Sequence, residues 1–365
     1  MAANIKNQVQ QKNQIQNQNL KKILDLTKDK EVFIATHYDA DGITSGAIIY
    51  HLIKNNAKKI NTTSKGLVFR IEPEDISGNP DIIICTDIKP SQNLDPKKVI
   101  YIDHHPMQPN APMLKDFLFH VFDHEAQSCS FLIWRDILQG SKFAVNSYMV
   151  FLTLLGYFGD GGKADNLPIE LQVIAGELLQ IETKKGIHNL MEKKKSFYGS
   201  GKDYLEIERY VSALNTGKRM HWHGNVPFEL MKSIDDIKLF IYNLHPIAEV
   251  LQDYKKQLRE YYEMPIEIHN TKRIQYAVIE CDKNIQGVLA SRHLKHKPLM
   301  VMNKLKDIVI ASMRVPDHLN FDAGAFLSEF NGKIEGLTGG GHEKAGGVTL
   351  ARDDFDRFVE LLNES

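Results

Sequence analysis

The sequence contains few cysteines, almost no net charge and no long apolar run. Its three cysteines, Cys85, Cys129 and Cys281, are scattered and show no CxxC spacing. This argues against a disulfide framework and a cysteine zinc site, and it favours a reducing, cytoplasmic compartment. The most apolar stretch, residues 143–158, is interrupted by polar side chains and is shorter than the roughly 20 residues of a membrane span. The first residues lack the apolar core of a signal peptide, so we expect neither an exported protein nor a membrane protein.

Charge alone gives little indication of a partner. The 365 residues include 45 Lys and Arg against 46 Asp and Glu, which leaves a net charge of −1. Taken by itself, this balance argues mildly against a polyanion such as nucleic acid as the substrate. The length fits two domains, each able to bury its own core.

Three apolar runs in the first part of the chain each end in acidic or imidazole residues. They are residues 31–36, followed by HYDADG, residues 81–86, followed by Asp87, and residues 98–102, followed by DHHP. Strand, turn and helix units of this kind predict an α/β fold with a parallel sheet whose carboxyl edge carries the site. Helices are expected at 20–26 and 43–54, twice within 127–158 up to a glycine-rich loop at 156–166, and again from 168.

Changes in pattern divide the chain into four segments. We expect a polar lead-in with a short helix at 1–30, a catalytic domain at 31–190, a helical connector at 191–268 and a smaller C-terminal α/β domain at 269–365. Within the last domain, the pattern predicts strands at 273–280, 297–302 and 307–314, helices at 287–294 and 323–330, a loop at 337–347, a short strand at 348–350 and a final helix from 353.

His37, Asp39 and Asp41 follow the first predicted strand at alternate positions. In an extended turn their side chains can converge, and two carboxylates this close repel each other unless a cation neutralises them. This pattern favours a metal site. The alternative is a helix cap, because Asp41 stands just before the helix expected from Ile43.

Further oxygen and nitrogen donors follow the other strands. Asp87 and the run Asp103-His104-His105 come at strand ends, and Asp160 lies in a glycine-rich segment. Each has a simpler interpretation as a cap, a turn residue or a hydrogen-bonded surface histidine. Together, mixed oxygen and nitrogen donors without a thiolate suit Mn²⁺ or Mg²⁺ better than structural zinc. Two such ions, about 3.5 to 4 Å apart, would share one carboxylate and activate water for attack on phosphorus.

These residues resemble the four ordered motifs of the DHH phosphoesterases, and the resemblance extends over about residues 31–350. It implies a two-domain fold and two divalent cations, most readily Mn²⁺, with Mg²⁺ as the alternative. It also implies that Asp87 is shared by both ions, that His105 faces the scissile phosphate, and that Asp103 orients an imidazole rather than binding an ion. One ion would be held by His37, Asp39 and Asp87, and the other by Asp41, Asp87, His104 and Asp160.

The segment GGGHEKAGG at 339–347 resembles the glycine-rich signature of the DHH-associated substrate domain. Glycines at 340 and 341 would let backbone N–H groups approach a phosphate, and His342 would add a donor. The alternative is a tight turn between a helix and a strand. Arg292 and Arg314 are further candidate anion contacts, although either could be a solvated surface residue.

A softer resemblance favours the RecJ-like branch of the family. Asn215 and Arg219 match an Asn followed four residues later by Arg, but Lys218 replaces the glycine usual before that Arg. The adjacent run 221–223, His-Trp-His, is either a base-stacking platform or, more simply, a packed Trp between polar neighbours.

The resulting hypothesis is a metal-dependent exonuclease that removes nucleotides from single-stranded DNA or RNA, with replication or DNA repair proteins as further partners and no membrane. One alternative is hydrolysis of short oligonucleotides (nanoRNA) or of small nucleotides such as pAp or a cyclic dinucleotide. A non-enzymatic alternative is a replisome scaffold, but all seven expected metal and catalytic side chains are present. The GGGH segment argues against a family II pyrophosphatase.

The metal hypothesis changes how the charge is interpreted. Residues 31–190 hold 14 basic against 19 acidic side chains, whereas residues 191–365 hold 25 of each. Two divalent cations would neutralise most of this acidic excess. The argument against a polyanion substrate therefore disappears.

Overall fold

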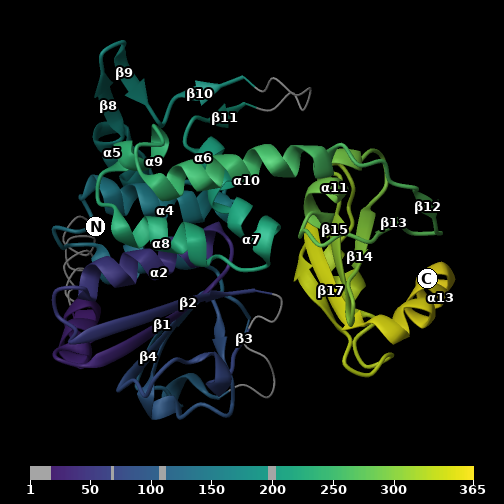
Figure 1. The fold of residues 1–365 in the computed structure, drawn as a ribbon, viewed down its shortest axis with the longest axis horizontal. Helices are drawn as coiled ribbons and strands as arrows, with labels where there is room; N and C mark the ends of the chain where they lie inside the picture. The colour runs from purple at the N-terminus through teal and green to yellow at the C-terminus, as the bar shows by residue number, and fades with distance from the viewer. Residues whose placement is uncertain (1–17, 67–69, 107–111, 196–202) are drawn as a thin grey trace, which may run out of the picture. The chain divides into compact units, whose positions relative to one another are not determined.

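The computed structural model describes residues 18–66, 70–106, 112–195 and 203–365, which form two compact units (Figure 1). The N-terminal unit comprises Met1–Lys218 and Trp222–Lys255, and the C-terminal unit comprises Arg219–His221 and Lys256–Ser365. Among the described helices, none combines the length and the hydropathy that a membrane crossing requires.

A five-stranded parallel sheet forms the centre of the N-terminal unit, as the sequence predicts. Its order is β2-β1-β4-β6-β7. The strands are β1 (Glu31–His37), β2 (Lys59–Lys65), β4 (Ile82–Thr86), β6 (Val99–Asp103) and β7 (Phe119–Phe122). Thr36 pairs with Thr86, and Thr86 pairs with Ile102. The carboxyl ends of β1, β4 and β6 are therefore aligned at one edge.

Burial on both faces explains why the middle residues of these three strands are largely apolar. Along β1, Ile34 packs in the large core beneath the helices, whereas Phe33 belongs to a smaller cluster on the opposite face. The edge strands β2 and β7 were not expected. β2 has the polar sequence KINTTSK, with only one fully buried residue, and therefore lacks the apolar pattern of a central strand.

Helices cover one face of the sheet. Residues 18–27 are helical, as expected. The layer contains α2 (Ala40–Ile53), α3 (Cys129–Ile133), its π-helical continuation Trp134–Leu138, and α4 (Ser147–Gly159). α2 packs against α3 and α4, and all its residues except Tyr50 are buried. The helix α4 extends four residues into the predicted glycine-rich loop, because Gly156–Gly159 form its last turn.

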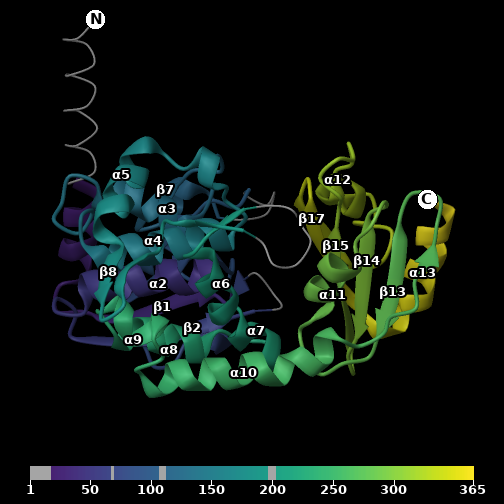
Figure 2. The same cartoon turned by 90° about the horizontal axis from the view of Figure 1, so that it is seen from above.

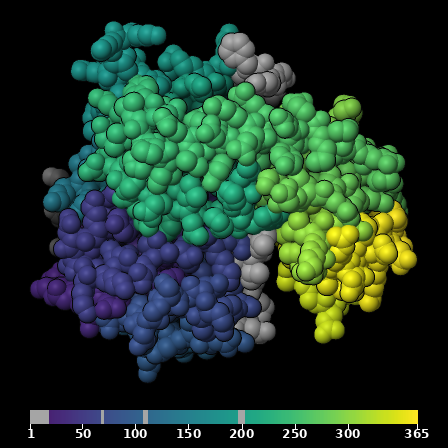
Figure 3. All heavy atoms as spheres, in the orientation of Figure 1, coloured from purple at the N-terminus to yellow at the C-terminus, as the bar shows by residue number. Residues whose placement is uncertain are grey.

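The segment expected as a helical connector begins with short strands. The elements after α4 are α5 (Ile169–Leu178), β8 (Gln180–Thr183), β9 (Gly186–Asn189), β10 (Lys193–Lys194), β11 (Tyr204–Leu205), α6 (Glu208–Leu214), α7 (Thr216–His221), α8 (Asn225–Ser233), α9 (Ile237–Ile241) and α10 (Pro246–Tyr262). α8 packs on α2, and α9 contacts α4. Figure 3 shows the green segment that contains α8 and α9 at the surface of the N-terminal unit.

Smaller elements complete this unit. A two-stranded parallel pair joins β3 (Arg70–Ile71) to β5 (Lys89–Pro90). Single 3₁₀ turns occur at Pro73–Asp75, Pro96–Lys98, Leu114–Asp116 and Ala164–Asn166, and another, at Arg352–Asp354, lies in the C-terminal unit.

The C-terminal unit contains a mixed six-stranded sheet of order β12-β13-β14-β15-β17-β16, visible from a second direction in Figure 2. Its elements are β12 (His269–Asn270), β13 (Gln275–Ile279), α11 (Gln286–His293), β14 (Leu299–Lys304), β15 (Ile308–Arg314), α12 (Ala323–Ser328), β16 (Thr338–His342), β17 (Ala345–Ala351) and α13 (Phe355–Glu364). The predicted strands and helices are all present.

The glycine-rich segment is a β-hairpin, not the predicted loop. Gly340 pairs with Gly347 and Gly341 pairs with Gly346. The reason is close packing, because a Cβ at Gly324 of α12 would lie 2.3 Å from the Gly341 carbonyl oxygen. Without side chains at these positions, the helix backbone rests directly on strand β16.

Candidate metal centre

The aligned strand ends bring the sequence-predicted donors of the N-terminal unit together. His37 ends β1, Asp87 follows β4, and Asp103 ends β6. Asp39 and Asp41 lie at the start of α2, and His104, His105 and Asp160 complete the cluster. Three overlapping groups have donor atoms within 4.8 Å of one another: His37, Asp39 and Asp87; Asp41, His104 and Asp160; and Asp87, Asp103, His104 and His105.

The first group surrounds the His37 imidazole. Its Nδ1 lies 3.0 Å from Asp39 Oδ2 and 3.6 Å from Asp87 Oδ2. Burial lowers the pKa of His37, but the two carboxylates outweigh it and raise the pKa to about 9. For Asp39, burial raises the pKa, but the positive charges of His37 and Lys218 outweigh burial and hold this pKa well below its usual range. The group therefore concentrates negative charge that cations stabilise.

The second group surrounds His104 Nε2. This atom lies 3.4 Å from Asp87 Oδ1, 3.5 Å from Asp160 Oδ2 and 3.8 Å from Asp41 Oδ2. Burial raises the pKa of Asp160 well above its usual range, and the Asp41 carboxylate raises it further. Because Asp87 directs Oδ2 to the first group and Oδ1 to the second, its carboxylate lies between them.

Asp41 is held by a helix N-terminus, and it does not cap α2. Its Oδ2 accepts from the Cys129 N–H at 2.6 Å, and its Oδ1 accepts from the Ser130 N–H at 2.9 Å. Burial and Asp87 raise its pKa to about 7. The cap is Asp39, whose Oδ1 accepts from the Gly42 N–H at 3.1 Å. α2 therefore begins at Ala40, three residues earlier than predicted.

Asp103 has the environment of an orienting group. Its Oδ1 accepts from His105 Nδ1 at 2.8 Å and from the His104 and His105 N–H groups at 2.7 and 3.0 Å. Its Oδ2 accepts from the Tyr101 hydroxyl at 2.7 Å. Burial raises the pKa of Asp103, but these donors outweigh it and lower the pKa to about 2. The hydrogen bond from His105 Nδ1 is the contact that an orienting role would use, and that role stays a prediction.

The donor set fits divalent cations. His104 Nδ1 contacts the Ala126 carbonyl at 3.0 Å, which turns Nε2 toward the cluster. Among the described residues, Asp87 Oδ1 and His104 Nε2 are buried without a hydrogen-bond partner. Asp87 also has a φ of +58°, a left-handed conformation that non-glycine residues rarely adopt outside turns and functional sites. Buried oxygen and nitrogen atoms left unsatisfied at one point suit a bound ion.

The glycines near Asp160 allow close packing rather than flexibility. Asp160 caps the C-terminus of α4. A Cβ at Gly156 would lie 2.0 Å from Ser130 Oγ and 2.5 Å from Asp41 Oδ1, and one at Gly159 would lie 2.7 Å from the Ala40 Cβ. Both glycines therefore let α4 approach the start of α2.

Some contributors were missed from the sequence. These are the Tyr101 hydroxyl and the N–H groups at the start of α3. Ser128, which caps α3 by accepting from the Phe131 N–H, is a recognisable signal for that helix start. Asn215 holds α2 in a similar way, because its Oδ1 accepts from the Ala40 N–H at 3.1 Å.

The predicted substrate residues lie in the C-terminal unit and are only partly grouped. Burial lowers the pKa of Arg314, and the nearby Arg219 guanidinium lowers it further. β15 and β17 pair Arg314 with Ala345, which also faces His342 of β16. Gly340 and Gly341 belong to the same strand β16. Arg292, by contrast, is exposed and paired with Glu263 at 2.7 Å.

The His-Trp-His run lies at the end of α7. Trp222 is half-buried and adopts φ +60°, and its N–H donates to the Lys218 carbonyl at 3.0 Å. This is the geometry of a helix C-terminus in the left-handed conformation.

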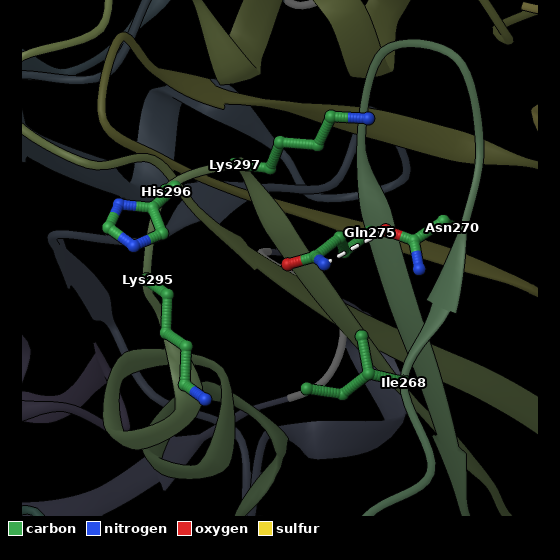
Figure 4. A pocket seen from close by; sticks show the side chains of 6 residues that line it. All are labelled: Ile268, Asn270, Gln275, Lys295, His296 and Lys297. Atoms are coloured by element: carbon green, nitrogen blue, oxygen red, sulfur yellow. Dashed lines mark hydrogen bonds between the residues drawn. The ribbon is translucent and has the colours of Figure 1, made fainter.

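A separate hollow lies at the edge of the C-terminal sheet opposite β16. Its volume is about 360 Å³, and it is lined by Ile268, Asn270, Gln275, Lys295, His296 and Lys297 (Figure 4). Asn270 accepts from Gln275 Nε2 at 2.9 Å, and Lys297 Nζ donates to the Thr271 carbonyl at 3.2 Å. No carboxylate lines this hollow, so it does not resemble the metal centre.

Family models match two parts of the chain: the DHH family N-terminal domain at residues 31–155 and the DHHA1 domain at residues 271–365. No curated protein shows significant sequence similarity to the chain.

Solved structures share the fold at low identity. A DHH-domain protein described as a member of a family of ribosomal proteins is 14% identical, with a TM-score of 0.60, over 95% of this chain and 88% of that one. Exonuclease RecJ bound to manganese is 16% identical, with a TM-score of 0.58, over 95% and 94%. RecJ from Thermus thermophilus with Mn²⁺ is also 16% identical, with a TM-score of 0.60, over 95% of this chain and 54% of that one.

Proposed function

Because the chain belongs to the DHH phosphoesterase superfamily, we propose that it is a two-metal phosphodiesterase that removes nucleotides from an end of single-stranded nucleic acid, as a RecJ-like exonuclease. The observation that carries this proposal is the position of Asp87. Its two oxygens face two different donor groups, at 3.6 Å from His37 Nδ1 and 3.4 Å from His104 Nε2.

We assign the donors to two ions. His37, Asp39 and Asp87 would hold one, and Asp41, Asp87, His104 and Asp160 would hold the other. Mn²⁺ is the preferred ion, with Mg²⁺ as the alternative. Solved RecJ structures with Mn²⁺ and with Mg²⁺ support this choice. When bound, two such ions would supply an activated water and would stabilise the attacking and leaving oxygens in phosphoryl transfer.

The protein itself fixes the catalytic imidazole. Because Asp103 is ionised at neutral pH and lies 2.8 Å from His105 Nδ1, it holds the His105 proton on that nitrogen. His105 Nε2 is then the atom that faces the scissile phosphate. Tyr101 and two backbone N–H groups hold Asp103 in turn, so the imidazole is oriented before substrate binds.

The C-terminal unit supplies the substrate contacts in this proposal. The positive charge of Arg219 lowers the pKa of Arg314, and an anion bound close to both would offset the repulsion between them. Gly340, Gly341 and His342 offer backbone and imidazole donors to the phosphates. Arg292 remains a proposed contact, although its pairing with Glu263 weakens the case.

We also propose a cellular location and protein partners. Three cysteines without a disulfide support a cytoplasmic location. Replication or DNA repair proteins are proposed as partners because a RecJ exonuclease is among the structures that share this fold.

The test is digestion of single-stranded DNA and RNA, labelled at the 5′ or the 3′ end, with Mn²⁺. We expect stepwise loss of nucleotides from one end of a 20-mer, with no cleavage of the matching duplex. A length series distinguishes the alternative, because faster cleavage of dinucleotides than of 20-mers would favour a short-oligonucleotide hydrolase. Absence of phosphoesterase activity on every nucleotide substrate would overturn the proposal in favour of a scaffold.

A further inference from the structure

Lys218 places a cationic side chain against the metal centre. Its Nζ lies 3.6 Å from Asp39 Oδ2 and 5.1 Å from the centre of the Tyr38 ring. The Lys218 side chain is 23% exposed. The ammonium therefore lies at the margin of the first donor group, partly shielded from water and resting on an aromatic face.

The Asp39 oxygen that faces the other donors of its group is Oδ2. Asp39 Oδ1 accepts from the Gly42 N–H and caps α2. Its Oδ2 lies 3.0 Å from His37 Nδ1 and faces Lys218. A divalent cation held by Asp39 would therefore use the oxygen that the ammonium already approaches.

Two cations that share one carboxylate oxygen compete for it. The ammonium offsets part of the Asp39 charge before an ion arrives, and once the ion binds, the two positive charges repel each other. In the described part of the chain, no lysine or arginine pairs with the second donor group, where His104 and Asp41 contact carboxylates and backbone groups. The two halves of the centre are thus electrostatically unequal.

We propose that Lys218 weakens divalent-cation binding at the half of the centre formed by His37, Asp39 and Asp87, so that this ion binds less tightly and exchanges more readily than the other. This inference rests on the proposed metal assignment and deepens it. Lys218 would not touch the ion itself and would act through its charge on Asp39. A partly exposed ion pair contributes up to about 1 kcal/mol, which corresponds to an effect of up to about fivefold on one dissociation constant.

The experiment is a Mn²⁺ titration of the full chain without substrate, followed by the electron paramagnetic resonance signal of free Mn²⁺. We expect the wild-type chain to bind two ions with different affinities. K218M should tighten the weaker site about three- to fivefold and leave the other unchanged. K218R keeps the charge and should retain the wild-type isotherm. K218Q, a second neutral variant, should reproduce the K218M result if K218M does not fold.

K232M is the matched control. Lys232 also stacks on aromatic rings, at 5.5 Å from Tyr50 and 5.1 Å from Phe228, and also pairs with a carboxylate, Glu229, at 2.7 Å. These partners lie outside the donor groups, so K232M should bind Mn²⁺ as the wild type does.

Unchanged or weaker Mn²⁺ binding in both K218M and K218Q would overturn the inference, and so would an equal tightening in K232M. Failure of this inference can be told apart from failure of the proposed function, because the titration contains no substrate. A chain that binds two ions unequally but cleaves nothing would refute the exonuclease proposal alone. A chain that binds no Mn²⁺ would refute both.

Discussion

Replacing Asp87 by asparagine should remove most of the stabilisation that Mn²⁺ gives the protein. Asparagine keeps the size of the side chain and tolerates the left-handed backbone at φ +58°, whereas alanine would add about 1 to 2 kcal/mol of strain. The substitution therefore removes one negative charge while the fold is retained. Because both oxygens of Asp87 face donor groups, the charge is lost to both ions.

The expected magnitude follows from linkage. At an ion concentration about 100 times the dissociation constant, each bound ion stabilises the fold by about 2.7 kcal/mol, so two ions contribute about 5 kcal/mol. A divalent ion and one negative charge about 4 Å apart interact by about 8 kcal/mol at an effective dielectric constant near 20. If the amide dipole and solvent replace about three quarters of this, about 2 kcal/mol is lost. Each ion then binds about 30-fold more weakly, and the two together contribute less than about 2 kcal/mol.

The assay is thermal unfolding with EDTA and with Mn²⁺. At about 2 to 4 °C per kcal/mol for a unit of this size, the Mn²⁺-induced rise in Tm should fall from about 10–20 °C to about 3–7 °C in D87N. D160N is the control, because Asp160 belongs to one donor group only, and it should retain about two thirds of the wild-type rise. An equal loss in both variants would refute the shared role of Asp87. Turnover in D87N should fall by at least about 100-fold.

Three further predictions concern pH, packing and substrate. In EDTA, the free energy of unfolding should decrease as the pH rises from about 5 to about 9. Asp41, with a folded-state pKa of about 7, and His104, with one of about 11, hold protons more tightly in the folded state, so their contribution to stability is lost as the pH rises through this range. An increase in the free energy of unfolding, measured by urea denaturation, would contradict this prediction. G341A should destabilise the C-terminal unit by more than about 2 kcal/mol in urea denaturation. Gly341 has a φ of +144°, and a Cβ there would lie 2.5 Å from a carbonyl oxygen. G340A is the control: the nearest atom to its Cβ would be 3.8 Å away, so it should cost less than about 1 kcal/mol. H342A should raise KM more than it lowers kcat in steady-state cleavage assays, and an effect on turnover alone would show that His342 is not a binding residue.

The central strands were predictable because burial on both faces makes β4 and β6 largely apolar up to their last residue, as their sequences show. A shared parallel direction then places the donors that follow them at one edge, so the position of the site follows from the pattern of apolar runs. Strand β2 escaped prediction because it is polar, and polar sequence is also typical of loops.

The misassigned elements depend on long-range contacts. Asp39 and Asp41 are equally good caps by residue type, and the choice is decided by the N–H groups of Cys129 and Ser130, which are 88 and 89 residues from Asp41. The hairpin β16–β17 looked like a loop because consecutive glycines are typical of turns. Its pairing is favoured by the close approach of α12, which no local pattern indicates.

The attachment of Asp41 to the first turn of α3 would couple an ion in the proposed metal centre to the start of that helix. The carboxylate that would hold an ion also accepts the N–H groups that begin this helix. An ion that draws Asp41 into a fixed geometry would therefore also restrain the start of α3. We expect slower amide hydrogen exchange at Cys129 and Ser130 when the centre is filled, so that these two amides report metal loading without any substrate.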